Sequence, residues 1–165
     1  MRVLGIDPGT AACGYGIVQV DGGRLSGLEH GWWATPARER LELRLRRIHD
    51  GVCELIARHE PDAVAIEESY VGADARTALS VGQARGAVLV ACAGASVPCA
   101  EYAPASVKHA VAGYGRADKT QVQRMIKQIL ALDEMPTPHH AADALAVAIC
   151  HALTPRRLRD TVGVP

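Results

Sequence analysis

The chain has 165 residues, the size of one ordinary domain and too short for two full-sized domains. Its 18 basic and 18 acidic residues cancel, so the total charge alone gives no sign of a nucleic-acid partner. No apolar run approaches the roughly 20 residues of a membrane span, and no signal peptide is recognised, which predicts a cytoplasmic protein without a membrane partner. Five cysteines with no C-x-x-C pair argue against a disulfide framework or a zinc site and predict reduced thiols.

Four strands and one helix are predicted before residue 68. The strands are short and rich in apolar or small residues, and they cover residues 2–7, 14–20, 25–34 and 63–67. The turn P-G-T-A-A-C between the first two favours a hairpin. Residues 38–60 carry apolar side chains at helical spacing and are followed by Pro61, which predicts an amphipathic helix. The run at 63–67 is expected to be a buried strand parallel to the first.

Helices dominate the rest of the chain. They are predicted at 75–95, 105–112 and 119–132, with a last helix that has Thr137 as its N-cap and Pro138 as its first residue. A further strand covers 97–102. The small residues Gly82 and Gly86 would let another backbone approach, either in the core or across a dimer face. This order indicates an α/β domain over 1–153, with a mixed five-stranded sheet flanked by helices, and a basic C-terminal tail over 154–165.

Acidic residues end two of the predicted strands. Asp7 ends the first strand, and Glu67 and Glu68 end the strand at 63–67. The sheet fixes the backbone of such residues, so carboxylates on neighbouring strands can converge on a divalent metal without flexible loops. Because side chains alternate along a strand, only one of Glu67 and Glu68 can face the same cleft as Asp7. Periodicity does not decide between them.

The last predicted helix can add further metal ligands. His139 and His140 stand four and three residues before Asp143, so either imidazole can share a helix face with the carboxylate. A buried Asp143 on this apolar helix would be costly unless a cation neutralised it. Together with the strand ends, this pattern indicates metal-assisted phosphodiester hydrolysis.

Basic residues are concentrated in one segment despite the neutral total. Between residues 102 and 128 a single acid, Asp118, accompanies five basic residues, and three more lie in the tail: Lys108, Arg116, Lys119, Arg124, Lys127, Arg156, Arg157 and Arg159. A basic face beside metal-binding acids is the pattern of a nuclease. The alternative is an ordinary solvated helix face.

The opening G-I-D-P-G-T also matches the phosphate-binding turn of actin-like and sugar-kinase ATPases. Those proteins duplicate the unit and bind nucleotide between two domains. This chain has one such turn, which disfavours the ATPase interpretation.

Five motifs together resemble the RuvC family of bacterial Holliday-junction resolvases over residues 1–153. They are G-I-D-P-G-T from Gly5, A-I-E from Ala65, G-Q-A-R-G from Gly82, K-x-x-V-Q from Lys119 and A-A-D-A-L-A-V-A from Ala141. The resemblance implies a ribonuclease H-like fold and a homodimer that resolves four-way DNA junctions by paired symmetric nicks in homologous recombination and DNA repair. It also implies two Mg²⁺ or Mn²⁺ ions per site and the branch-migration proteins RuvA and RuvB as partners.

The resemblance also implies residue roles. It selects Glu67 over Glu68 and His140 over His139; Asp7 would bridge both ions, Glu67 would hold one, and His140 with Asp143 the other. One ion would activate water and the other would stabilise the leaving 3′ oxygen. The family most often has Asp where this chain has His140, so a preference for Mn²⁺ is expected. The helix dipole is expected to keep the His140 ring neutral.

By the same resemblance, four residues are expected to bind DNA: Tyr70, by stacking on a base, and Arg76, Lys108 and Lys119. Two alternatives remain. One is a ribonuclease H-like nuclease that cleaves RNA in a hybrid duplex, and the other is a junction-binding scaffold without catalysis.

Overall fold

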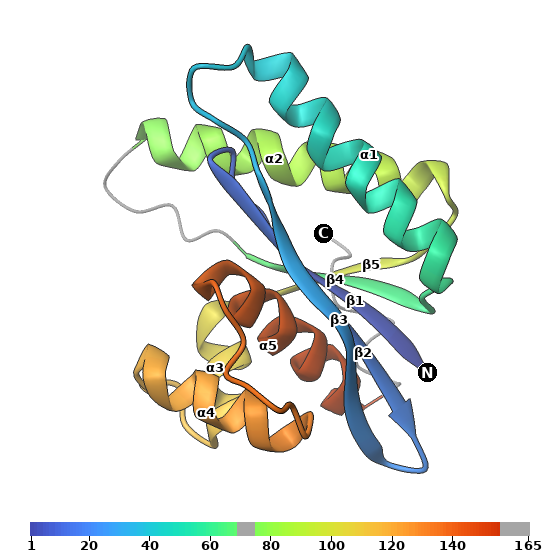
Figure 1. Ribbon diagram of the computed structural model, residues 1–165, viewed down its shortest axis with the longest axis vertical. Helices are drawn as coiled ribbons and strands as arrows, with labels where there is room; N and C mark the ends of the chain where they lie inside the picture. The colour runs from blue at the N-terminus through green and yellow to red at the C-terminus, as the bar shows by residue number, and fades with distance from the viewer. Residues whose placement is uncertain (69–74, 156–165) are drawn as a thin grey trace.

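One mixed sheet forms the centre of the computed structural model, which describes residues 1–68 and 75–155 (Figure 1). Its strands are β1 (Arg2–Asp7), β2 (Ala12–Asp21), β3 (Arg24–Ala34), β4 (Ala63–Glu67) and β5 (Cys99–Tyr102), in the order β3-β2-β1-β4-β5. β1 and β2 form the predicted hairpin, and β1 pairs in parallel with β4, which pairs in parallel with β5. The mixed five-stranded sheet is therefore confirmed.

Helices cover both faces of the sheet. α1 (Leu41–His59) and α2 (Ala75–Gly94) lie on one face, whereas α3 (Pro104–Ala112), α4 (Lys119–Ile129) and α5 (His139–Leu153) lie on the other (Figure 1). Two apolar clusters result because strand side chains alternate: Ile6 and Ile66 pack toward α1 and α2, while Val3 and Ala65 pack toward α5. None of the helices in the described part of the chain is long and apolar enough to span a membrane.

The start of α5 differs from the prediction. Pro138, not Thr137, is the N-cap, and the helix begins at His139. Pro138 has extended backbone angles (φ −70°, ψ −177°), and no side chain caps the helix. The carbonyl of Pro138 instead accepts the first helical bond, from the N–H of Ala141 at 3.0 Å. The predicted N-cap and the predicted first residue of the helix are therefore each one position too early.

Two glycines let α5 lie close against β1 and β2. A Cβ at Gly5 would collide with the carbonyl of Ala144, and one at Gly14 would collide with the carbonyl of His140. Any side chain at either position would push α5 off the sheet. The two glycines therefore allow the start of α5 to lie beside the end of β1.

Gly82 and Gly86 do not have such a role inside the molecule. A Cβ at either position would meet no atom of the described residues within 4 Å. Leu79 and Val90, on the same helix, are 65% and 64% exposed. Core packing of α2 through these glycines is thus excluded for the described residues.

Candidate active site

The register of β1 and β4 places Asp7 next to Glu67. Ile6 pairs with Ile66, and both side chains lie in the core under α1 and α2. The next residue of each strand therefore faces α5, which brings Asp7 and Glu67 to the same side of the sheet edge. Glu68 is exposed and lines a different groove, beside β5. Periodicity left open whether Glu67 or Glu68 faces Asp7. The structure decides for Glu67, because Ile66 packs on the opposite face of the sheet.

The first turn of α5 contacts the end of β1. His140 Nδ1 lies 2.7 Å from Asp7 Oδ2. His139 points elsewhere, because its Nδ1 lies 3.2 Å from Gln123 Nε2 on α4. Of the two candidate histidines, the structure brings only His140 to Asp7.

A cleft holds the acids from β4 and α5 together with two lysines. Lys119 Nζ, in the first turn of α4, lies 3.5 Å from Asp143 Oδ2. The walls are acidic, basic and apolar side chains from β4, α3, α4 and α5: Glu67, Pro104, Val107, Lys108, Lys119, Val122, Asp143 and Ala146. Asp143 is thus only partly buried, and the cation beside it in this structure is the Lys119 ammonium.

Burial, helped by neighbouring acids, raises the pKa values of two carboxyl groups at this edge. Burial raises the pKa of Glu67 to about 7, and the charges of Asp7 and Asp143 add to the effect while Lys119 and Lys108 oppose it. Burial also raises the pKa of Asp143, against the lowering effect of Lys119. Raised pKa values mean that the ionised carboxylates are destabilised in the metal-free protein. A bound cation would relieve this destabilisation, so the site favours one.

The pKa of His140 is raised rather than lowered. Its hydrogen bond with Asp7 is the main cause and outweighs the opposing effect of burial. The helix dipole was expected to keep the ring neutral, but that expectation is wrong for this arrangement because an anionic partner lies within hydrogen-bonding distance.

The donor set fits a divalent metal by its chemistry. Three carboxylates and one imidazole are oxygen and nitrogen ligands suited to Mg²⁺ or Mn²⁺. Over residues 1–68 and 75–155, no three His, Cys, Asp or Glu side chains form a ready-made metal cage. Asp7 and His140 instead contact each other directly, so ion binding would exchange this hydrogen bond for metal ligation.

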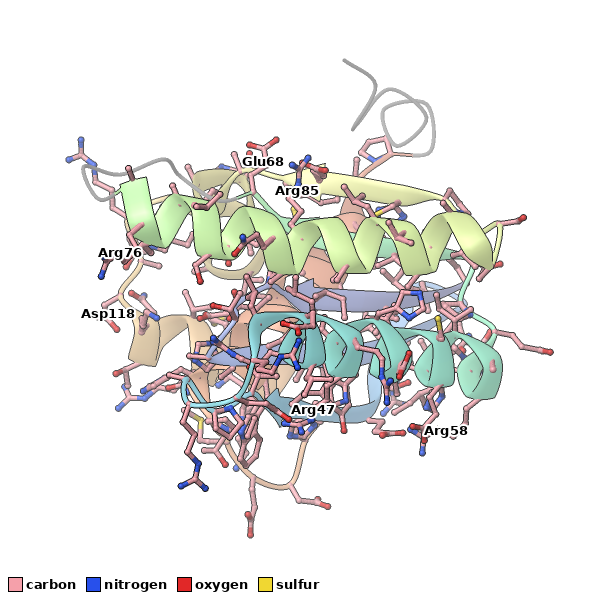
Figure 2. The ribbon with its side chains drawn as sticks, turned by 90° about the horizontal axis from the view of Figure 1, so that it is seen from above. Arg47, Arg58, Glu68, Arg76, Arg85 and Asp118 are labelled. Carbon is pink, nitrogen blue, oxygen red and sulfur yellow. The ribbon has the colours of Figure 1, made fainter. Side chains whose placement is uncertain are left out.

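The structure describes three of the four predicted DNA-binding residues, in two places. Lys108 and Lys119 line the cleft, and Arg76 is exposed in the first turn of α2. Figure 2 shows Arg76 at the same end of the molecule as Asp118, the N-cap of α4. Tyr70 and the tail arginines lie outside the described residues. Of the five basic residues of the predicted face that the structure describes, the four at positions 108, 116, 119 and 124 line the cleft or are exposed.

Sequence reasoning missed Arg44. Its Nε donates to the carbonyl of Thr10 at 2.9 Å, and the Thr35 hydroxyl donates to the same oxygen. These bonds fasten the turn that follows Asp7 to α1 and to the end of β3. Arg44 stands on the polar side of an amphipathic helix, where an arginine is ordinary, so the sequence carries no signal of this role.

Comparison with known proteins identifies the family. The family model described as crossover junction endodeoxyribonuclease RuvC matches residues 3–151. The RuvC endodeoxyribonuclease of Heliobacterium modesticaldum is 52% identical over 156 residues, which cover 93% of this chain and 96% of that protein. That of Moorella thermoacetica is 50% identical over 161 residues, covering 97% and 96%.

Two solved structures are similar throughout. Thermus thermophilus RuvC has 42% identity and a TM-score of 0.88, covering 96% of this chain and 98% of that one. The same protein in complex with a Holliday junction substrate has a TM-score of 0.90 at 42% identity, covering 98% and 96%. These matches confirm the ribonuclease H-like fold. The chain therefore belongs to the RuvC family of crossover junction endodeoxyribonucleases.

Proposed function

We propose that this protein binds four-way DNA junctions and resolves them by paired symmetric nicks, in homologous recombination and DNA repair. The observation that carries the proposal is the convergence of Asp7, Glu67, His140 and Asp143 at one sheet edge. Support also comes from the similarity to Thermus thermophilus RuvC in complex with a Holliday junction substrate.

Nucleases of this family depend on divalent metal. In this chain Asp7 is the residue proposed to be shared by two Mg²⁺ or Mn²⁺ ions, with Glu67 on one and His140 with Asp143 on the other. Bound ions would supply a lowered pKa for the attacking water and stabilisation of the leaving 3′ oxygen.

The chain's own residues position the metal ligands and attract the phosphate. The sheet holds Asp7 and Glu67 at fixed positions, and Gly5 and Gly14 keep α5 close enough for His140 to reach Asp7. α3 and α4 begin at this cleft, with Pro104 and Lys119 in its walls, so the positive ends of two helix dipoles favour a phosphate there.

Cationic side chains add to that attraction. Lys108 and Lys119 are proposed to bind the scissile phosphate and its neighbours, and Arg76 to contact a more distant phosphate. Tyr70, outside the described residues, is proposed to stack on a junction base.

A homodimer would supply the second active site. The exposed stripe of Leu79, Gly82, Gly86 and Val90 on α2 is the proposed contact, because it is apolar and open. An isologous pair holds two sites at a fixed separation, matching the two-fold symmetry of a junction. RuvA and RuvB remain the proposed partners, in the cytoplasm, as the family resemblance implies.

One experiment separates this function from its alternatives. The pure protein is incubated with a synthetic four-way junction, a plain duplex and an RNA/DNA hybrid, with and without Mn²⁺. Metal-dependent nicking of the junction alone supports the proposal. Preferential cleavage of the hybrid would identify a ribonuclease, and junction binding without any nicking would identify a scaffold.

A further inference from the structure

Trp32 lies in the same cross-strand row as the catalytic candidate Asp7. Asp7 on β1 pairs with Gly14 on β2, and Gly14 pairs with Trp32 on β3. Residues directly opposite one another on neighbouring strands project to the same face. Two strand spacings of about 5 Å each put the two backbones about 10 Å apart.

The face in question is the one that carries the active site. Gly14 lies directly under the backbone of His140, so the first turn of α5 crosses this row between Asp7 and Trp32. Trp33, the next residue, faces the opposite way and packs against Gly51 and Tyr15, with ring centroids 4.8 Å apart for the Tyr15 pair. The alternation along β3 therefore places the Trp32 indole on the same side as Asp7 and His140.

Trp32 is 49% exposed, which is unusual for the largest apolar side chain. Its ring is a stacking surface left open to solvent beside a site built for a phosphodiester. Lys108 and Lys119 reach that site from the β4 side, whereas Trp32 borders it across β2. A DNA strand that runs from the lysines across Asp7 and continues around the start of α5 would reach Trp32.

The distance suits a nucleobase near the cleaved bond. Stacked nucleotides rise about 3.4 Å each along a strand, so about 10 Å is about three nucleotides, and fewer where the strand is unstacked. Aromatic rings bind unpaired bases by stacking with little regard to base identity. A junction crossover offers such bases, because the stack is interrupted there.

We propose that Trp32 stacks on a nucleobase within about three nucleotides of the cleaved phosphodiester, on the side of the site opposite Lys108 and Lys119. Trp32 is thus a DNA-positioning residue, and the inference rests on the proposed junction-binding function. Stacking would hold the distorted strand with its phosphate at Asp7.

Intrinsic fluorescence tests the contact directly, because the chain has two tryptophans. The parent, Trp32→Phe and Trp33→Phe are titrated with a synthetic junction in the absence of divalent metal, and binding is followed in parallel by gel shift. Quenching is expected in the parent and in Trp33→Phe but not in Trp32→Phe. If Trp33→Phe fails to fold, the difference between the parent and Trp32→Phe gives the same information. Equal quenching in the parent and Trp32→Phe while the junction is bound overturns the proposal.

Kinetics give a second readout. Trp32→Ala should weaken junction binding or kcat/KM by about tenfold, with recovery in Trp32→Phe. Leu28→Ala is the matched control, because Leu28 lies on the same strand and is 48% exposed. Equal effects of the two alanine variants, or a change in dimer mass with Trp32→Ala, overturn the proposal. If the parent protein nicks junctions but Trp32 shows no quenching and no effect of substitution, this inference alone is refuted. If the parent protein binds no junction, the proposed function is refuted as well.

Discussion

His140 Nδ1 lies 2.7 Å from Asp7 Oδ2 and joins two residues 133 positions apart in the chain. This hydrogen bond ties the start of α5 to the end of β1. It also raises the pKa of the His140 ring, so a proton competes with a metal ion for this imidazole. The choice of metal and the response to pH both follow from this pair.

His140 is predicted to set the metal preference. Imidazole suits Mn²⁺ better than Mg²⁺, so junction nicking should be several-fold faster with Mn²⁺ at matched concentrations. His140→Asp should narrow that difference, because it restores an oxygen ligand, and His139→Asp serves as the control. Nicking rates with each metal for the three proteins measure the effect. An unchanged ratio in His140→Asp would remove His140 from the ligand set.

Without divalent metal, stability is predicted to fall as pH rises. The folded-state pKa of Glu67 is about 7, above its usual 4.5, so between these values the folded protein binds more protons than the unfolded chain. Stability must then decrease with increasing pH through that window. The raised pKa values of Asp143 and His140 act in the same direction, each over its own range.

Thermal unfolding from about pH 5 to about pH 8 checks this prediction, with an expected fall of a few degrees in Tm attributable to this site. Glu67→Gln should flatten the slope, and added Mn²⁺ should raise Tm most at the alkaline end. A parent and a Glu67→Gln variant with identical slopes would contradict the account.

Much of the fold follows from local patterns in the sequence. The hairpin, the buried strand ending in Glu67 and the amphipathic helix after residue 40 have clear apolar periodicity and clear terminators. The start of α5 was harder, since Thr137-Pro138 resembles a cap and first turn while Pro138 itself is the cap. That choice depends on backbone angles that residue types do not specify.

The site shows the same division. The location of the acids at strand ends is visible in the sequence, but the choice of Glu67 over Glu68 requires knowing which face receives Ile66. Both faces of this sheet are covered by helices, so apolar residues fill both sets of alternating positions and give no parity signal. The pairing of Lys119 with Asp143 joins two helices, and no local pattern predicts it.

Lys119 is predicted to bind phosphate as well as to neutralise Asp143. Lys119→Ala should weaken junction binding or turnover and lower the salt dependence of binding by about one unit of slope. Lys127→Ala, in the last turn of the same helix, should have a smaller effect. Binding measured over a range of salt concentrations tests both variants. Equal slopes for the parent and Lys119→Ala would mean that this ammonium makes no phosphate contact.

The open stripe on α2 is predicted to be the dimer contact. Gly86→Leu should convert the protein to monomers or weaken the dimer, because the larger side chain would separate the two helices. Gly94→Leu is the control, since a Cβ there also meets no described atom but Gly94 ends the helix. Light scattering gives the masses. A folded Gly86→Leu dimer indistinguishable from the parent would exclude this face.

Nicking of a four-way junction by Glu67→Gln and Glu68→Gln, compared with the parent in Mn²⁺, tests the central claim most directly. The two glutamates are adjacent, but only Glu67 lines the cleft with Asp143. Glu67→Gln should lose at least about a hundredfold in nicking rate while junction binding is retained, and Glu68→Gln should keep near-normal rates. Near-normal nicking by Glu67→Gln, or equal losses in the two variants, would contradict an active site built from Asp7, Glu67, His140 and Asp143.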